Sequence, residues 1–319
     1  MTRTRVRVAL AATVMFGAPG LLAEQPAPSP RDALPILEHP VALSVVGRVT
    51  RTLPDFGEVR LIAPSELVPS ARWSIPEGAS LSGRCPDLTP FQLQGPLLDA
   101  TSPCKPVRPS TPLSPIAPLR ERVSPTVPRV LSPRSTYVRE LTWIAWQEVP
   151  DQRSYLVHVL NERFEPVWSQ RVQEASRVRY TAHALPAGVP YTIRVATSDG
   201  TSQTERADIS FRVLSDQARS AVERAEARLR ATKGLGAIDR RFLRALALRR
   251  FGLLAEAIDE LREPRVPAFQ FELAKSLISV GLFDLAAEEL RGVTRNSAPE
   301  SCVARASTRL LREIGTSLQ

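Results

Sequence analysis

A proline-rich stretch near the middle of the chain most constrains how it can fold. Residues 105–134 contain eight prolines among serine, threonine and arginine, and a segment of this composition cannot form a hydrophobic core. We interpret it as an extended spacer, which at about 3.1 Å per residue would separate its neighbours by tens of ångströms. The sequence therefore predicts a multidomain protein, with separate structured regions on either side of a proline-rich linker.

The N-terminus has the pattern of a cleavable export signal. Arg3, Arg5 and Arg7 precede an apolar run at residues 8–23 that ends in small residues. The run is shorter than the ~20 residues that span a bilayer and is interrupted by glycine and proline, so retention as an anchor is the weaker alternative. We predict that residues 1–23 are a signal peptide, that no stable transmembrane span remains, and that the protein is periplasmic or secreted.

Composition and motifs argue against several classes of function. The formal net charge of +9 includes three signal arginines, and the mild basic bias that remains does not indicate nucleic-acid binding. The three cysteines and three histidines lack the paired spacings of zinc ligands. Nucleophile-elbow, zinc-protease and phosphate-loop motifs are missing from the sequence. We therefore predict a protein that is not an enzyme and has no cofactor, metal or nucleic-acid partner.

The region before the linker has β-strand signals. Residues 24–40 are rich in proline and alanine and are expected to be a disordered leader. Residues 41–104 contain short apolar runs separated by turn residues, which predicts a small β-domain. A disulfide between Cys85 and Cys104 would contribute about 3 kcal/mol to this domain in an oxidising compartment. Cys302 is then left over and is expected to be a buried small apolar residue.

Part of this region resembles a known periplasmic family. The segment WSIPEGASLSGRCPDLTPFQLQG is loosely similar to the small β-domain of FecR-type periplasmic proteins. A generic small β-barrel explains the same pattern equally well. The resemblance would imply a sensing role.

Residues 135–214 have the alternating pattern of a β-sandwich. The segments LTWIAWQEVPDQRSYLVHVLN and LPAGVPYTIRVAT resemble a fibronectin type III domain. The resemblance implies that Tyr191 is the tyrosine corner, whose hydroxyl bonds back to the preceding turn. Trp143 and Trp146 are three residues apart, so on one strand they face opposite sides. One of them should be in the core, and the sequence leaves open which.

Residues 215–319 switch to helical periodicity and contain an internal repeat. Residues 252–262 align with residues 281–291 at a period of 29. In each unit a helix, at 239–251 and then 267–280, ends near Gly252 or Gly281, and the next helix has Ala257 or Ala286 where two helices approach. This design resembles the tetratricopeptide repeat, although the period is shorter than the usual 34. The sequence thus predicts a C-terminal helical repeat domain, capped by helices at its two ends.

The helical region also holds the densest basic cluster of the chain. It lies on or beside the first repeat helix and consists of Arg240, Arg241, Arg244, Arg249 and Arg250. It is either a docking surface for an acidic partner or a solvated face balanced by nearby carboxylates. Our leading hypothesis is an exported scaffold or adaptor that binds a protein or peptide partner in the cell envelope through its helical repeats. The alternative is an envelope protein that binds glycan or peptidoglycan through its β-domains.

Overall fold

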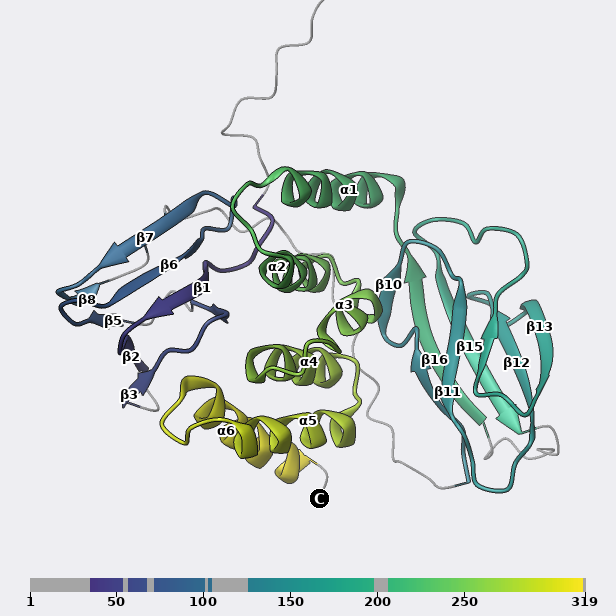
Figure 1. Cartoon of the computed structure of the whole chain (residues 1–319). Helices are drawn as coiled ribbons and strands as arrows, with labels where there is room; N and C mark the ends of the chain where they lie inside the picture. The colour runs from purple at the N-terminus through teal and green to yellow at the C-terminus, as the bar shows by residue number, and fades with distance from the viewer. Residues whose placement is uncertain are drawn as a thin grey trace, which may run out of the picture. The chain divides into compact units, whose positions relative to one another are not determined.

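The computed structural model describes residues 35–53, 57–67, 72–100, 103–104, 126–197 and 206–317. The predicted signal peptide and most of the predicted linker lie outside these ranges. The described residues form β-sheets in the N-terminal and middle regions and six helices in the C-terminal region (Figure 1). This order of a β region, a second β region and a helical region confirms the sequence-based prediction at that level.

The N-terminal region consists of two four-stranded antiparallel sheets. Their strand orders are β4-β1-β6-β7 and β3-β2-β5-β8. Alternate side chains of the strands share one core, which includes Trp73, Ile75 and Leu81 and also receives Val293 and Cys302 from the helical region. The strands are β1 (Val41–Val46), β2 (Thr50–Leu53), β3 (Gly57–Arg60), β4 (Ser65–Glu66), β5 (Arg72–Ile75), β6 (Ser80–Arg84), β7 (Pro90–Gln94) and β8 (Leu97–Ala100).

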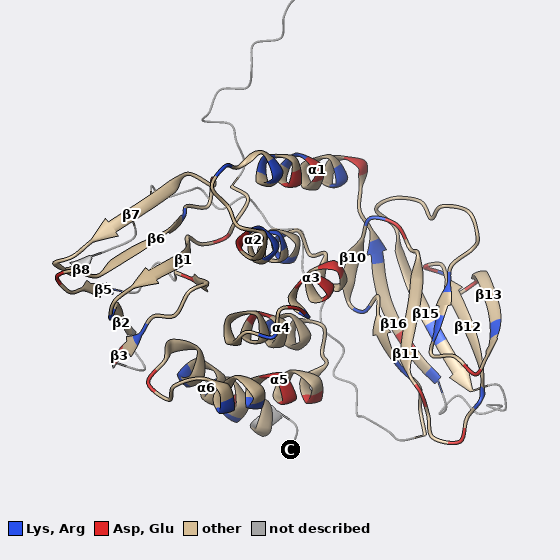
Figure 2. Cartoon of the chain, in the orientation of Figure 1, with Lys and Arg blue, Asp and Glu red and all other residues tan. Residues whose placement is uncertain are grey.

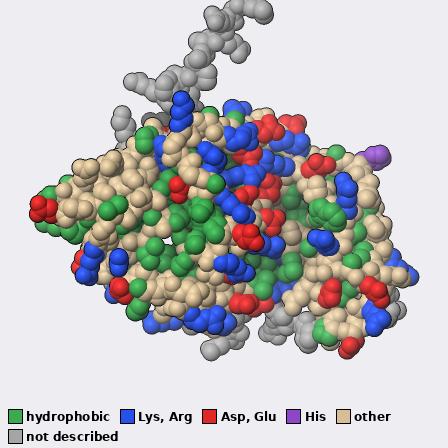
Figure 3. All heavy atoms as spheres, viewed as in Figure 1, with side chains coloured by type: hydrophobic (Ala, Val, Ile, Leu, Met, Phe, Trp, Pro, Cys, Tyr) green, Lys and Arg blue, Asp and Glu red, His purple; other side chains and the backbone are tan. Residues whose placement is uncertain are grey.

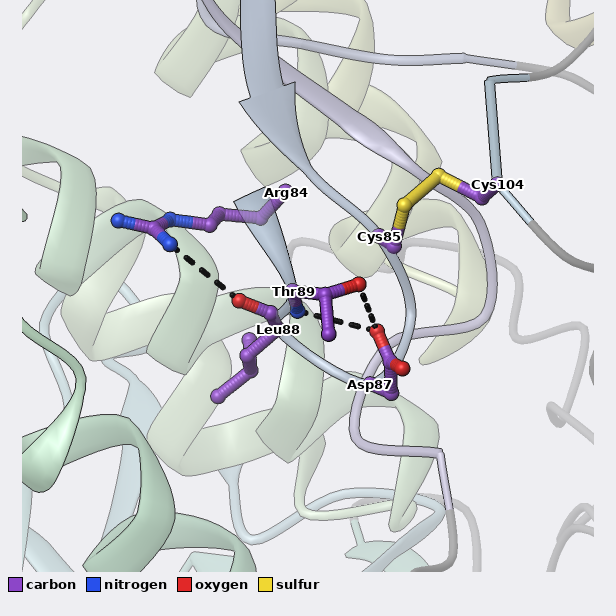
Figure 4. Close-up of a disulfide and its surroundings, with 6 residues drawn as sticks. All are labelled: Arg84, Cys85, Asp87, Leu88, Thr89 and Cys104. Atoms are coloured by element: carbon purple, nitrogen blue, oxygen red, sulfur yellow. Dashed lines mark hydrogen bonds between the residues drawn. A yellow bond between two sulfur atoms is a disulfide. The ribbon is translucent and has the colours of Figure 1, made fainter. Parts of the chain in front are cut away.

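The predicted disulfide joins Cys85 to Cys104 in this region (Figure 4). The turn that follows Cys85 is held by Asp87, whose carboxylate accepts hydrogen bonds from the backbone N–H of Thr89 at 3.0 Å and from its hydroxyl at 2.6 Å. Arg84 links this turn to the residues that follow helix α1 (Asp216–Ala231). It donates to the Leu88 carbonyl at 3.4 Å and to the Lys233 carbonyl at 2.8 Å. The disulfide is therefore part of a turn that also contacts the helices.

The middle region is a sandwich of two sheets. A five-stranded sheet has the order β10-β16-β15-β12-β13, and a three-stranded sheet has the order β14-β11-β9. All neighbouring strands are antiparallel except β10 and β16. The strands are β9 (Arg129–Ser132), β10 (Thr136–Val138), β11 (Trp143–Gln147), β12 (Ser154–Leu160), β13 (Pro166–Gln173), β14 (Arg177–Arg179), β15 (Pro190–Thr197) and β16 (Arg206–Val213).

The core of the sandwich shows which tryptophan faces inward. Trp146 is 2% exposed and contacts the ring of Tyr155 edge-on, whereas Trp143 on the opposite face of β11 is 51% exposed. Tyr191 is buried and stacks on Phe211. The hydroxyl of Tyr155 binds back to the preceding turn by accepting a hydrogen bond from the N–H of Val149 at 2.9 Å.

The C-terminal region consists of helices that pack in sequence order (Figure 1). Ser215 caps the first of them by accepting a hydrogen bond from the N–H of Ala218, as its position before the apolar pattern predicts. Pro267 occupies the first turn of the fourth, where its missing N–H is not needed. The helices are α1 (Asp216–Ala231), α2 (Ala237–Arg250), α3 (Leu254–Leu261), α4 (Pro267–Ser279), α5 (Phe283–Asn296) and α6 (Cys302–Ser317).

The two repeat units have equivalent turns. Gly252 follows α2 with φ of +69°, and Gly281 follows α4 with φ of +78°, a conformation that glycine adopts without steric cost. A Cβ at Gly252 would also lie 2.9 Å from the ring of Tyr137. Ala257 on α3 and Ala286 on α5 are completely buried against the neighbouring helices. Small residues therefore occupy the positions where the helix pairs approach.

Both repeat turns are bound by the strands that begin the sandwich. At the first turn, the Thr136 hydroxyl donates to the Gly252 carbonyl at 2.7 Å and accepts from the N–H of Leu254 at 2.8 Å. At the second, Arg134 donates to the Val280 carbonyl at 2.8 Å, and Arg129 pairs with Asp284 at 2.6 Å. The sandwich thus supplies helix-end hydrogen bonds that the helices do not make themselves.

These contacts correct three expectations from the sequence. Residues 129–132 lie within the predicted linker but form β9 of the sandwich. Ile36 and Leu37 lie within the predicted disordered leader, yet they are buried in the core of the helical region. Residues 34–319 form one compact unit, so the structured regions are not held apart. Composition averaged over a long segment hid the short apolar stretches that make these contacts.

Candidate functional site

A cavity of about 550 Å³ lies between the N-terminal sheets and the helical region. A volume of this size falls within the range of pockets that bind small ligands or peptide side chains. Its walls come from the loop before β1, strands β2 and β4, and helices α2, α4 and α6. The lining residues are Glu38, His39, Arg51, Ser65, Glu66, Arg249, Phe271, Glu272, Lys275, Ser279, Cys302, Val303, Ala306, Arg309, Leu310 and Glu313.

One wall of the cavity is a buried cluster of two carboxylates and two cations. Arg249 bridges Glu66, at 2.7 Å, and Glu272. Lys275 bridges the same two carboxylates, each at 2.9 Å. The side chains of Glu66 and Glu272 are 9% and 5% exposed. Alternating charges in a closed ring compensate each other, which offsets much of the cost of removing them from water.

The charge cluster is assembled from three separate elements. Glu66 ends the two-residue strand β4, and Arg249 lies in the last turn of α2. Glu272 and Lys275 are three residues apart on α4, so the helical period places them on one face. The sequence singles out Arg249 by its basic neighbours but gives no signal for its partners, because no local pattern connects residue 66 with residues 249–275.

The cluster shifts the pKa values of its members. Burial by itself would raise the pKa of Glu66, but Arg249 and Lys275 outweigh it and lower that pKa to about 2. Burial likewise opposes the charge of Arg249, yet the two carboxylates raise its pKa above the ordinary value. Glu66, Arg249 and Lys275 are therefore charged at neutral pH.

Arg51 lies on the cavity wall without a carboxylate partner among the described residues. Its side chain is largely enclosed, with the residue 7% exposed, and its Nε has no hydrogen-bond acceptor. The Nη1 donates to the carbonyl of Glu66 at 3.4 Å, and the guanidinium lies 6.0 Å from the centre of the Trp73 ring. Burial lowers the pKa of Arg51, although an arginine remains a cation at neutral pH.

Part of the cavity lining is apolar. It includes Phe271 on α4 and Val303, Ala306 and Leu310 on α6. Cys302, a free cysteine, is buried beside them, as its position on the last helix led us to expect. Figure 3 shows hydrophobic side chains gathered on this face of the molecule, next to a band of mixed basic and acidic side chains. The cavity therefore offers charged and apolar contacts together.

The five arginines of the predicted basic cluster all contact other parts of the molecule. Figure 2 shows the basic residues of α2 between acidic residues of neighbouring helices. Arg240 and Arg241 donate to the carbonyls of Leu235 and Glu260, and Arg244 pairs with two carboxylates. Arg249 belongs to the cavity cluster, and Arg250 donates to the Leu37 carbonyl. All five guanidinium groups therefore bind partners within the protein, and they do not form one continuous basic stripe on the helix surface.

A second ion network joins the sandwich to α1 and α2. Arg139, which follows β10, donates two hydrogen bonds of 2.8 Å to Glu226 on α1. Arg244 on α2 donates to the same carboxylate at 3.0 Å. These hydrogen bonds, that of Arg139 first, lower the pKa of Glu226 to about 2 although burial opposes the shift. Glu226 is therefore a shared acceptor for cations from two regions.

The depressed pKa values predict a loss of stability in acid. Glu66 and Glu226 have folded-state pKa values of about 2, below the value of 4.5 that a glutamate has in an unfolded chain. Their contribution is complete above pH ~4.5 and is lost as the pH falls towards 2. Urea midpoints measured from pH 6 to pH 2 should fall most steeply in this window. E226Q should make the urea midpoint depend less on pH. E223Q, at an exposed position on the same helix, should leave this dependence unchanged. Equal pH dependence in the two variants would contradict the lowered pKa of Glu226.

Comparisons with known proteins add no functional assignment. No family model matches the chain, and no curated protein is significantly similar to it in sequence. Within the described residues, no group of three or more histidine, cysteine or acidic side chains is arranged to hold a metal ion. No described helix has the length and apolar character needed to cross a membrane. The cavity and its charged wall are therefore the features from which a function has to be argued.

Proposed function

We propose that the protein is an exported, non-catalytic binding protein that holds a protein or peptide partner through its helical region. The observation that carries this proposal is the cavity of about 550 Å³ with walls from α2, α4 and α6. Stacked helix pairs commonly bind extended peptides on such surfaces. The disulfide between Cys85 and Cys104 supports an oxidising compartment such as the periplasm or the cell exterior.

The architecture supports this proposal in two further ways. The two-sheet sandwich agrees with a fibronectin type III-like module, and the helix pairs with their glycine turns agree with tetratricopeptide-like repeats. Stacked helical repeats form concave surfaces that are used for binding. The hydrogen bonds from Thr136 and Arg134 to the repeat turns would hold the binding helices in a defined orientation.

The test is partner capture by the full-length mature protein from its own cell envelope. Ala306 lines the cavity, and A306W should block it and reduce capture of a defined crosslinked partner by at least tenfold. Ala227 on α1 is exposed and does not line the cavity, so A227W is the matched control and should retain the partner. Equal capture by both variants, each shown to be folded by circular dichroism, would contradict binding at the cavity.

The alternative is glycan or peptidoglycan binding through the β regions. Trp143 supports it, because its exposed ring on β11 has the guanidinium of Arg177 5.6 Å from its centre. Sugar platforms usually need a second aromatic on the same face, but the residue opposite Trp143 on β14 is Arg179. Sedimentation with insoluble peptidoglycan that is lost in W143A and kept in A306W would favour this alternative over the first proposal.

A further inference from the structure

The charges around the cavity leave one buried cation without a counter-ion. The ring formed by Glu66, Arg249, Glu272 and Lys275 is neutral as a whole. Arg309 pairs with Glu313 at 2.7 Å near the cavity rim, where about half of each side chain is exposed. Glu38, which also lines the cavity, is largely exposed and lies 3.9 Å from His39. Arg51 is enclosed and, among the described residues, has a carbonyl but no carboxylate as its acceptor.

An unpaired cation in such a position is costly to the free protein. Burying a charge without a partner is unfavourable, and natural proteins seldom keep one unless it has a function. A guanidinium has five N–H donors in a planar arrangement that suits a carboxylate. The unpaired guanidinium of Arg51 therefore favours an anionic ligand, and its planar donors favour a carboxylate.

The other residues that line the cavity indicate the chemistry of the rest of the ligand. The lining includes the hydroxyls of Ser65 and Ser279 and many charged groups, so a long alkyl chain would remove polar groups from water without replacing their hydrogen bonds. Phe271, Val303 and Leu310 nevertheless provide apolar contacts for a side chain. A peptide segment, with polar backbone and an apolar side chain beside a carboxylate, satisfies both parts.

We propose that the cavity binds a carboxylate of a peptide partner, with Arg51 as its receptor and the Phe271–Leu310 side of the cavity holding the adjacent apolar side chain. The proposal rests on the proposed function and specifies the chemistry of its ligand. The carboxylate can be the C-terminus of the partner or an acidic side chain, since both present the same group.

The probes are N-acetyl-L-leucine and its neutral analogue N-acetyl-L-leucinamide, titrated into the full-length mature protein by NMR. The acid should bind about ten- to a hundredfold more tightly than the amide, because a hydrogen bond to a charged group is lost in the amide. N-acetyl-L-glutamic acid α-amide, which has only a side-chain carboxylate, distinguishes the two sources of the group. The proposal would be overturned if the acid, the amide and the side-chain probe bound with equal affinity. It would also be overturned if none of the three bound.

The variant R51M separates a ligand-binding role from a structural one. It should abolish the preference for the acid without lowering the melting temperature of the free protein, because it removes an unpaired buried charge. R309M is the matched control, since Arg309 lines the same cavity but is half exposed and paired, and it should keep the preference. A lowered melting temperature together with an unchanged preference in R51M would assign Arg51 a purely structural role.

A third probe tests the peptide part of the proposal. Hexanoate has the carboxylate but no amide, so binding of hexanoate without binding of N-acetyl-L-leucine would overturn a peptide occupant in favour of a fatty acid. One outcome is that R51M loses the acid preference but keeps the envelope partner, while A306W loses that partner. In that case only the role of Arg51 in holding the partner would fail, and the proposed function would stand. If A306W also kept the partner, the proposed function itself would fail.

Discussion

Replacing Arg249 with methionine is expected to lower the free energy of unfolding by about 3–5 kcal/mol, because it breaks a buried ion cluster. Arg249 contacts both Glu66 and Glu272, whose side chains are almost completely enclosed. Without it, two buried carboxylates would share the single charge of Lys275. The measurement is equilibrium unfolding in urea at pH 7, read by circular dichroism.

The matched control for Arg249 is R262M. Arg262 pairs with Asp259 at 3.5 Å, but about two thirds of each side chain or more is exposed. Such surface pairs contribute roughly 0–1 kcal/mol, so R262M should change little. If R249M and R262M lowered the free energy of unfolding by similar amounts, burial would not explain the contribution of these ion pairs. A loss below about 1 kcal/mol in R249M would contradict the assignment of a buried cluster.

W146A is expected to cost about 3–5 kcal/mol of stability, whereas W143A should cost less than about 1 kcal/mol. The two residues lie on the same strand, but Trp146 is 2% exposed and Trp143 is 51% exposed. Removing Trp146 leaves a cavity beside Tyr155 that the surrounding strands can fill only in part.

Urea unfolding of the two tryptophan variants under the same conditions checks this prediction. Because both substitutions remove the same atoms, the comparison cancels the intrinsic effect of the mutation and reports the difference in burial. Equal destabilisation, or a larger loss for W143A, would contradict the inward orientation of Trp146. A preserved fold in W143A is also required before that variant can be used to test glycan binding.

Local structure was largely predictable from the sequence. The helix ends at Ser215, Gly252 and Gly281 follow from capping and from the φ angles that glycine permits, which depend only on neighbouring residues. The alternation along β11 showed that one of its two tryptophans is buried. It could not show which, because that depends on the side of the strand that the second sheet covers.

The boundaries of the regions were less predictable. Eight prolines made residues 105–134 look like a uniform linker, although residues 129–132 form a strand. Arg129 and Arg134 lie in this segment, and they bind the second repeat turn at Asp284 and Val280. An arginine in a polar segment has the same local pattern whether its guanidinium faces water or a helix end.

The candidate site was decided by tertiary structure alone. The sequence by itself determined the order of β and helical regions, the repeat turns and the two cysteines available to pair, because these depend on short-range periodicity and on residue type. The cavity brings together Arg51, Glu66 and Arg249 from two distant regions. Whether such charges are solvated, paired or left unpaired depends on which side chains the packed chain places within a few ångströms, and electrostatic interactions over that distance have no signature in sequence spacing.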